Sequence, residues 1–114
     1  STPTLPPTPT SVPKERLVGI LGRVIDEKGI NPAWSDDIDR FELLRWTMGF
    51  AGASVQDLES MKPVVLADPD RPGVWVVELQ FTIAGEQNVA TWHYFEEDDR
   101  VVPANDWARL VDRG

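Results

Sequence analysis

The sequence predicts an α+β fold: two to three N-terminal helices packed on one face of a three- to four-stranded antiparallel meander, and a short C-terminal helix or edge strand. In the first half of the chain, apolar residues recur every three or four positions, the period of a helix. In the second half they alternate with polar residues, the period of a strand, between Gly-, Pro- and Asp-rich turns. Helices and strands segregated in this way favour a sheet covered on one face.

The first thirteen residues, STPTLPPTPTSVP, contain five prolines and four threonines and predict an extended, disordered spacer. Residues 14–114 then form a single α+β domain, a suitable length for one core. A tether to an anchor or neighbouring domain is the favoured role, which slightly favours an extracytoplasmic location. A proline-rich ligand for an SH3-type groove is the alternative, since prolines 3, 6 and 9 have PxxP spacing.

The net charge of −8 argues against nucleic acid and against an anionic membrane surface, because both are bound through Lys and Arg. The chain has no cysteine, which removes disulfides, thiolate metal sites and cysteine nucleophiles. No apolar run approaches the ~20 residues of a membrane-spanning helix. No catalytic, metal or cofactor motif is present, so we expect neither an enzyme nor a cofactor.

Three helices are predicted before the sheet. The first covers 14–28, with an apolar stripe that includes Leu17, Ile20 and Val24. Its Gly19 and Gly22 either permit close approach of a neighbouring element or are merely tolerated. Ser35 is expected to cap a second helix that runs to about Gly49 and is buried on two sides, including Trp46 and Phe50.

Charge pairs Asp36–Arg40 and Glu42–Arg45 are expected on the second helix. A capping box at 54–57 opens a short third helix that ends near Met61. Strands are predicted at 64–67, 74–84, 89–95 and 100–103, and Asn105 is expected to cap the terminal segment.

The central hairpin at 74–95 determines which side chains face the core. Trp75 and Phe81 share one face of its first strand with Val77, Leu79 and Ile83. A four-residue loop, 85–88, pairs Trp92 with Phe81 and leaves His93 opposite Gln80 on the outer face. A five-residue loop would flip the second strand and bury His93.

Acidic residues gather in the two turns that a meander places at one end of its sheet. They are Asp68, Asp70, Glu96, Glu97, Asp98 and Asp99. With the outer-face residues Glu78 and His93, they form the predicted partner-binding set. A basic protein partner is one interpretation; a Ca²⁺ site is another, although Pro72 and Leu79 stand where a calcium loop needs oxygen ligands. Solvated turns that discourage edge aggregation are the third. His93 with Glu78 is the one pair suggestive of acid–base chemistry, and it lacks a nucleophile.

The expected function is therefore a non-enzymatic accessory domain that binds a protein partner through the acidic turns or the outer sheet face. The alternative is a carrier of a small apolar ligand, with a pocket between the second helix and the sheet. The general shape resembles the cystatin and nuclear-transport-factor folds, and that resemblance is what implies such a pocket. Most of the tryptophans, at 34, 46, 75, 92 and 107, are expected in the core.

Overall fold

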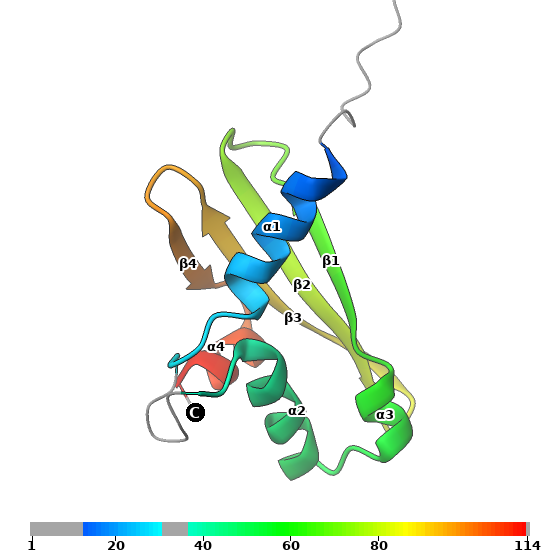
Figure 1. The fold of residues 1–114 in the computed structure, drawn as a ribbon. Coiled ribbons are helices and arrows are strands. Elements are labelled where there is room, and N and C mark those ends of the chain that lie inside the picture. Colours follow the sequence, from blue (N-terminus) through cyan, green and yellow to red (C-terminus); the bar gives the residue numbers. More distant parts are fainter. Residues whose placement is uncertain (1–12, 31–36, 114) are drawn as a thin grey trace, which may run out of the picture.

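The computed structural model describes residues 13–30 and 37–113. Within them the chain forms helices on one face of an antiparallel sheet, which confirms the predicted α+β class (Figure 1). The elements are α1 (Lys14–Ile25), α2 (Arg40–Phe50), α3 (Val55–Glu59), β1 (Lys62–Ala67), β2 (Val74–Ile83), β3 (Glu86–Phe95), β4 (Arg100–Pro103) and α4 (Asp106–Arg113). The predicted spacer lies outside the described residues, except for Pro13.

Helix α1 is shorter than predicted and ends at Ile25, with Asp26 at its C-cap. Its apolar stripe faces the core, where Ile20, Val24 and Ile25 are buried. A Cβ at Gly19 would meet nothing within 4 Å, so no neighbour in the described chain uses this glycine for close approach.

Helix α2 begins at Arg40, later than predicted, because Asp39 provides the cap: its carboxylate accepts the Glu42 N–H at 2.9 Å. The predicted cap Ser35 and the Asp36 partner of Arg40 lie outside the described residues. The predicted Glu42–Arg45 pair is present at 3.7 Å. Burial on two sides is wrong for the C-terminal half of α2, because Trp46 and Phe50 remain exposed.

Helix α3 has the predicted capping box and also holds the tip of the hairpin. The Ser54 hydroxyl accepts the Asp57 N–H, and the Asp57 carboxylate accepts the Ser54 N–H at 3.0 Å. The same buried carboxylate accepts the Ala84 N–H at 3.2 Å. These N–H donors, Ser54 first and Ala84 second, hold the pKa of Asp57 below its usual range.

The sheet is a meander in the order β1-β2-β3-β4, but the register of its hairpin differs from the prediction. The loop is the two residues Ala84 and Gly85, so Trp92 lies opposite Val77 and His93 opposite Val76. Both loop residues have positive φ, +53° and +85°, the conformation of a type I′ turn that matches strand twist. The polar segment 86–88, predicted as loop, therefore belongs to β3.

The predicted faces survive this shift because every partner moves by an even number of residues. Trp75, Val77, Phe81, Trp92 and Tyr94 are buried on the helix side. His93 lies on the opposite, outer face, so the five-residue loop is excluded.

The left-handed backbone at Ala84 predicts a stabilising substitution. Alanine is strained there, whereas asparagine adopts positive φ more readily and Asn-Gly is the preferred type I′ pair. Ala84→Asn is expected to raise the free energy of unfolding by about 1 kcal/mol and the Tm by about 4–8 °C, measured by thermal and urea unfolding. Ala84→Val, which is β-branched, should lower both. Equal stability of the two variants would contradict the turn geometry.

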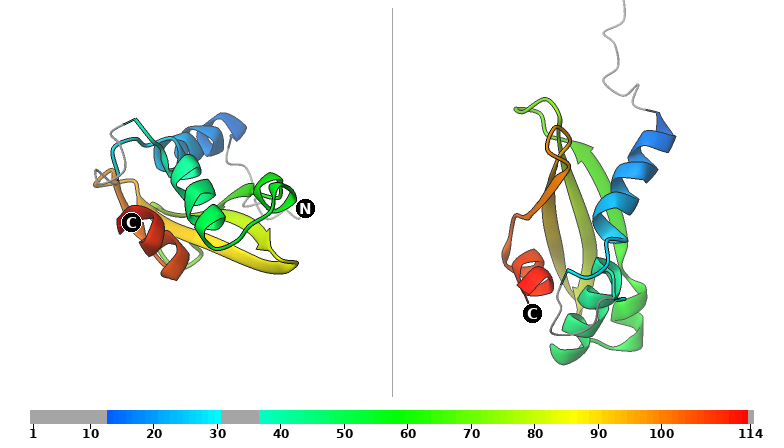
Figure 2. Two further views of the ribbon diagram at one scale, coloured as in Figure 1. Left: turned by 90° about the horizontal axis from the view of Figure 1, so that it is seen from below. Right: turned by 60° about the vertical axis from the view of Figure 1, so that its left-hand side comes forward.

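The C-terminal segment is a helix rather than an edge strand. The Asn105 side chain accepts the Ala108 N–H at 3.1 Å, as predicted for a cap, and also accepts the Thr91 N–H at 3.1 Å, which ties α4 to β3. Ala108 and Val111 are buried in the same core as α1 and α2. In the described part of the chain α1, α2 and α3 lie on one side of the sheet (Figure 2), and α4 joins the same core through Ala108 and Val111. None of the described helices is long and apolar enough to cross a membrane.

Candidate functional site

The two acidic turns lie side by side at one end of the sheet, as the meander predicts. The Glu96 N–H donates to the Gly73 carbonyl at 2.9 Å and joins the turn after β1 to the turn after β3. The predicted carboxylates do not form one cluster, however, because the sheet separates them. Glu96 and Asp99 point toward α1, whereas Asp68 points to the outer face.

On the outer face, Asp68 is bound by its own turn. It accepts the Asp70 N–H at 2.9 Å and two N–H groups of Arg71 at 3.1 and 2.9 Å. These donors, first the Asp70 amide and then Arg71, hold the pKa of Asp68 below its usual range. Arg71 Nη2 also lies 3.3 Å from His93 Nδ1, so Asp68, Arg71 and His93 form a row across the end of the face.

On the helix side, the carboxylates of the second turn hold α1 against the sheet. Glu96 accepts the Trp75 indole N–H at 2.9 Å and pairs with Arg16 of α1. Asp99 accepts the Tyr94 hydroxyl and the Arg23 Nε–H, each at 2.8 Å.

These donors lower the pKa of both turn carboxylates. The Trp75 N–H and then Arg16 act on Glu96, and Arg23 and then Tyr94 act on Asp99. Burial first, and then the Asp99 carboxylate, raises the pKa of the Tyr94 hydroxyl.

The same arrangement recurs deeper in the molecule at Arg40. Its guanidinium binds both oxygens of Asp112 at 3.0 and 3.1 Å, and Asp112 accepts the Trp92 indole N–H at 3.1 Å. Arg40 also donates to Glu27 at 2.6 Å and to the Val24 carbonyl at 2.9 Å. Burial alone would raise the pKa of Glu27, but Arg40 and then Arg23 outweigh it and keep the pKa low.

Within the described residues, three arginines therefore share one geometry: each lies over an aromatic ring whose polar hydrogen binds the same carboxylate as the guanidinium. The distances from Cζ to the ring centroid are 5.4, 5.8 and 5.8 Å. The three sets are Arg16–Glu96–Trp75, Arg23–Asp99–Tyr94 and Arg40–Asp112–Trp92. In each set a cation–π contact and charge-assisted hydrogen bonds act on the same arginine, so the three sets stabilise the fold.

The lowered pKa values predict a loss of stability in acid. A carboxylate whose pKa is lower in the folded than in the unfolded state contributes stability above the unfolded pKa, about 4, and this contribution is lost as the pH falls through the folded value. The urea midpoint should therefore fall from about pH 5 downward. Asp99→Asn should lower the midpoint at pH 7 and reduce its pH dependence, while Glu97→Gln on the same turn should do neither. If the wild type, Asp99→Asn and Glu97→Gln have the same urea midpoint at every pH, Asp99 is not a source of the acid sensitivity.

The outer face carries partly exposed apolar groups and has no helix over it among the described residues. The pairing of β1 with β2 puts Val64 and Leu66 on this face beside Val76. At its acidic end, Phe95 lies under the guanidiniums of Arg71 and Arg100, at 5.6 and 4.5 Å.

Glu78 and His93 are diagonal neighbours on the outer face, because Glu78 lies opposite Thr91 and His93 opposite Val76. Glu78 accepts a long 3.4 Å hydrogen bond from Gln80. The His93–Glu78 acid–base pair is thus not assembled, since His93 lies next to Arg71 instead.

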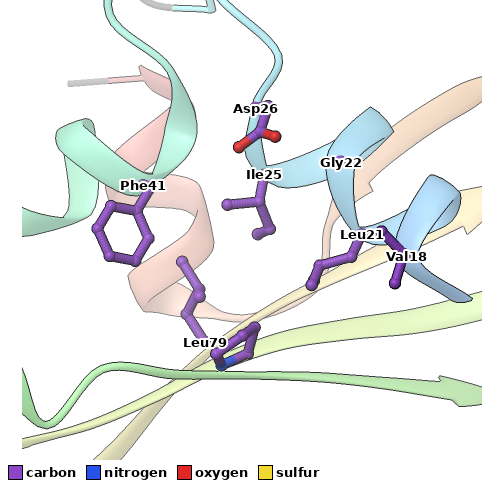
Figure 3. Close-up of a pocket in the computed structure, with 8 residues that line it drawn as sticks. Val18, Leu21, Gly22, Ile25, Asp26, Phe41 and Leu79 are labelled. Atoms are coloured by element: carbon purple, nitrogen blue, oxygen red, sulfur yellow. The ribbon is translucent and has the colours of Figure 1, made fainter.

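An apolar groove lies on the helix side, between α1 and α2 above β1 and β2 (Figure 3). Its volume is about 260 Å³, and Leu21, Ile25, Phe41 and Leu79 project toward it. Asp26 is a polar residue at its margin. Neither Trp46 of α2 nor His93 lines it.

The calcium interpretation finds no support in residues 13–30 and 37–113, where no group of three potential ligands is placed to hold a metal ion. Sequence patterns missed the buried role of Arg40, since an arginine on an amphipathic helix ordinarily faces solvent. They also missed the exposed Trp46 and Phe50, because an aromatic at helical spacing ordinarily faces the core. No protein-family model, no curated protein and no solved structure matches this chain.

Proposed function

We propose that this chain is a non-enzymatic interaction domain that binds a protein partner through the outer face of its sheet. The observation that carries the proposal is the placement of the described helices on the other face, which leaves Leu66, Val76 and Phe95 outside the core cluster. Aromatic and arginine side chains gathered on a partly apolar surface are typical of the energetic centres of protein interfaces. The cluster of Phe95 with Arg71 and Arg100 has this composition.

The acidic turns support a secondary role in this contact. Glu96, Asp99 and Asp68 are engaged by arginines of the same chain, which reduces what they offer to a partner. Asp70 and Glu97 make no ion pair within the described residues, and Asp98 lies 3.5 Å from Arg100. These three exposed carboxylates favour a partner with a basic residue at that end, where they would affect mainly the association rate.

The test is affinity capture with three baits: the wild-type chain, Phe95→Ala on the outer face and Phe50→Ala on α2. The two variants remove the same side chain from opposite sides of the molecule. We expect the wild type and Phe50→Ala to recover the same protein, and Phe95→Ala to recover about tenfold less, as for a residue at an interface centre. Loss of the partner with Phe50→Ala alone would move the contact to the helix side and overturn the proposal.

The apolar groove favours a second candidate, a carrier of a small apolar ligand. Its volume of about 260 Å³ is near the lower end of the ~300–1,000 Å³ usual for ligand sites, so only a small or partly exposed ligand would fit. Native mass spectrometry of the purified chain tests this directly. A co-purifying small molecule that is lost in Leu21→Gln, without recovery of a protein partner, would favour the carrier over the interaction domain.

A further inference from the structure

We infer that strand β1 is a self-pairing edge, through which two copies of this chain associate into one continuous sheet. In the described chain β1 is the edge of the meander and pairs only with β2. The inference concerns the edge of the sheet and is independent of the partner proposed for its outer face.

The edge strand lacks most of the features by which proteins prevent edge pairing. Its sequence, KPVVLA, contains one lysine and no acidic residue, in a chain that has 19 Asp and Glu residues. Its register with β2 is continuous from Lys62 to Ala67, without a bulge. Inward-pointing charges, bulges and covering loops are the usual protections. Lys62 and Pro63, both at one end of the strand, are the exceptions, and they leave 64–67 open.

The backbone pairing determines which groups point away from the sheet. The Asp68 N–H donates to the Val74 carbonyl at 2.9 Å, in the same register as the rest of β1. Because hydrogen-bonded pairs alternate along an antiparallel ladder, Leu66 and Val64 also bond to β2, whereas Val65 and Ala67 direct their N–H and carbonyl groups outward. Pro63 directs only a carbonyl outward.

A two-fold axis at Val65 fits these outward groups to those of a second copy. Val65 then exchanges both hydrogen bonds with its counterpart, and each Ala67 N–H donates to the Pro63 carbonyl of the other copy. Because Pro63 has no N–H, the reciprocal hydrogen bond to the Ala67 carbonyl of the other copy is absent. Residues directly opposite each other share a face, so both copies keep their helices on the same side of the joined sheet.

The side chains are complementary in this same register. Val64 lies opposite Leu66 of the second copy, and Leu66 is 53% exposed in the single chain. Lys62 lies opposite Asp68, which already binds Arg71 of its own chain, so the lysine adds a second, weaker cross-strand attraction at each end of the contact. On the helix side, Val18 of α1 is 60% exposed and lines the groove with Pro63, so association would cover apolar surface on both faces of the edge.

The experiment is sedimentation velocity of the full chain over a roughly hundredfold concentration range, since association makes the mass depend on concentration. We expect the wild type to approach twice the mass of one chain at high concentration. Ala67→Pro removes only an outward N–H and should leave a folded monomer, which circular dichroism checks. Lys62→Glu should weaken association about tenfold, whereas Lys28→Glu, the same charge change away from the edge, should not.

A mixing experiment fixes the register. Lys62→Glu alone places Glu opposite Asp, and Asp68→Lys alone places Lys opposite Lys, so each should be largely monomeric. Because Asp68 also accepts the Asp70 and Arg71 N–H groups, circular dichroism first checks that Asp68→Lys remains folded. An equimolar mixture restores an attractive pair at both ends and should form a heterodimer. A wild type that stays monomeric at every concentration, or a dimer that Ala67→Pro leaves intact, would overturn the inference.

Discussion

Replacement of Arg40 by methionine is expected to lower the free energy of unfolding by about 3–5 kcal/mol. The Arg40 side chain is 4% exposed and neutralises Asp112 and Glu27 inside the molecule. Methionine keeps much of the apolar stem of Arg40. It leaves the carboxylate of Asp112, whose side chain is only 15% exposed, without its positively charged partner. A buried charge that loses its partner carries a large desolvation penalty. Urea unfolding monitored by tryptophan fluorescence measures the loss.

Arg45→Met is the matched control for this variant. Arg45 lies on the same helix, but its side chain is 38% exposed and its pair with Glu42 is long, at 3.7 Å. Exposed pairs contribute little, so this change should cost less than about 1 kcal/mol. Adding Asp112→Asn to Arg40→Met should recover part of the loss, because it removes the orphaned charge and keeps an acceptor for Trp92. If the two methionine variants lose equal stability, Arg40 is not the internal ion-pair centre.

Replacement of Phe81 by alanine is the second large effect, with an expected loss of about 3–5 kcal/mol. Phe81 is 1% exposed, and its ring meets that of Trp107 edge to face, with centroids 5.0 Å apart. The substitution removes this contact and leaves a cavity between β2 and α4. Thermal unfolding and urea unfolding both report it.

Phe95→Ala provides the comparison, since it removes the same side chain from the opposite face of the sheet. Phe95 is only partly buried and packs against the arginine side chains above it, so we expect a loss below about 1.5 kcal/mol. A large difference between the two variants confirms the two-faced sheet and shows that the outer face can be altered without unfolding the domain. Equal losses would mean that the outer face is also core.

The sequence by itself determined the features that depend on local periodicity. Alternation along β3 puts Trp92 and Tyr94 on one face and His93 on the other in any register. Trp92 and Tyr94 stay on the core face because the register differs from the predicted one by an even number of residues. The capping box at 54–57 and the Asn105 cap were also predictable, because each satisfies backbone groups only three residues away. The convergence of the acidic turns followed from the meander order.

The tertiary structure alone decided the hairpin loop and the direction of the charged groups. The turn residues are Ala84 and Gly85 instead of the Asn-Gly pair that usually signals a two-residue hairpin loop. The turn is held by the carboxylate of Asp57, 27 residues earlier in the chain.

The burial of Arg40 has no local sequence signal, because its carboxylate partners, Glu27 and Asp112, are 13 and 72 residues away in the chain. The meander order placed six acidic residues at one end of the sheet, but only the packing of α1 showed that Glu96 and Asp99 bind its arginines. Long-range contacts of this kind have no local pattern, since they depend on which elements pack together.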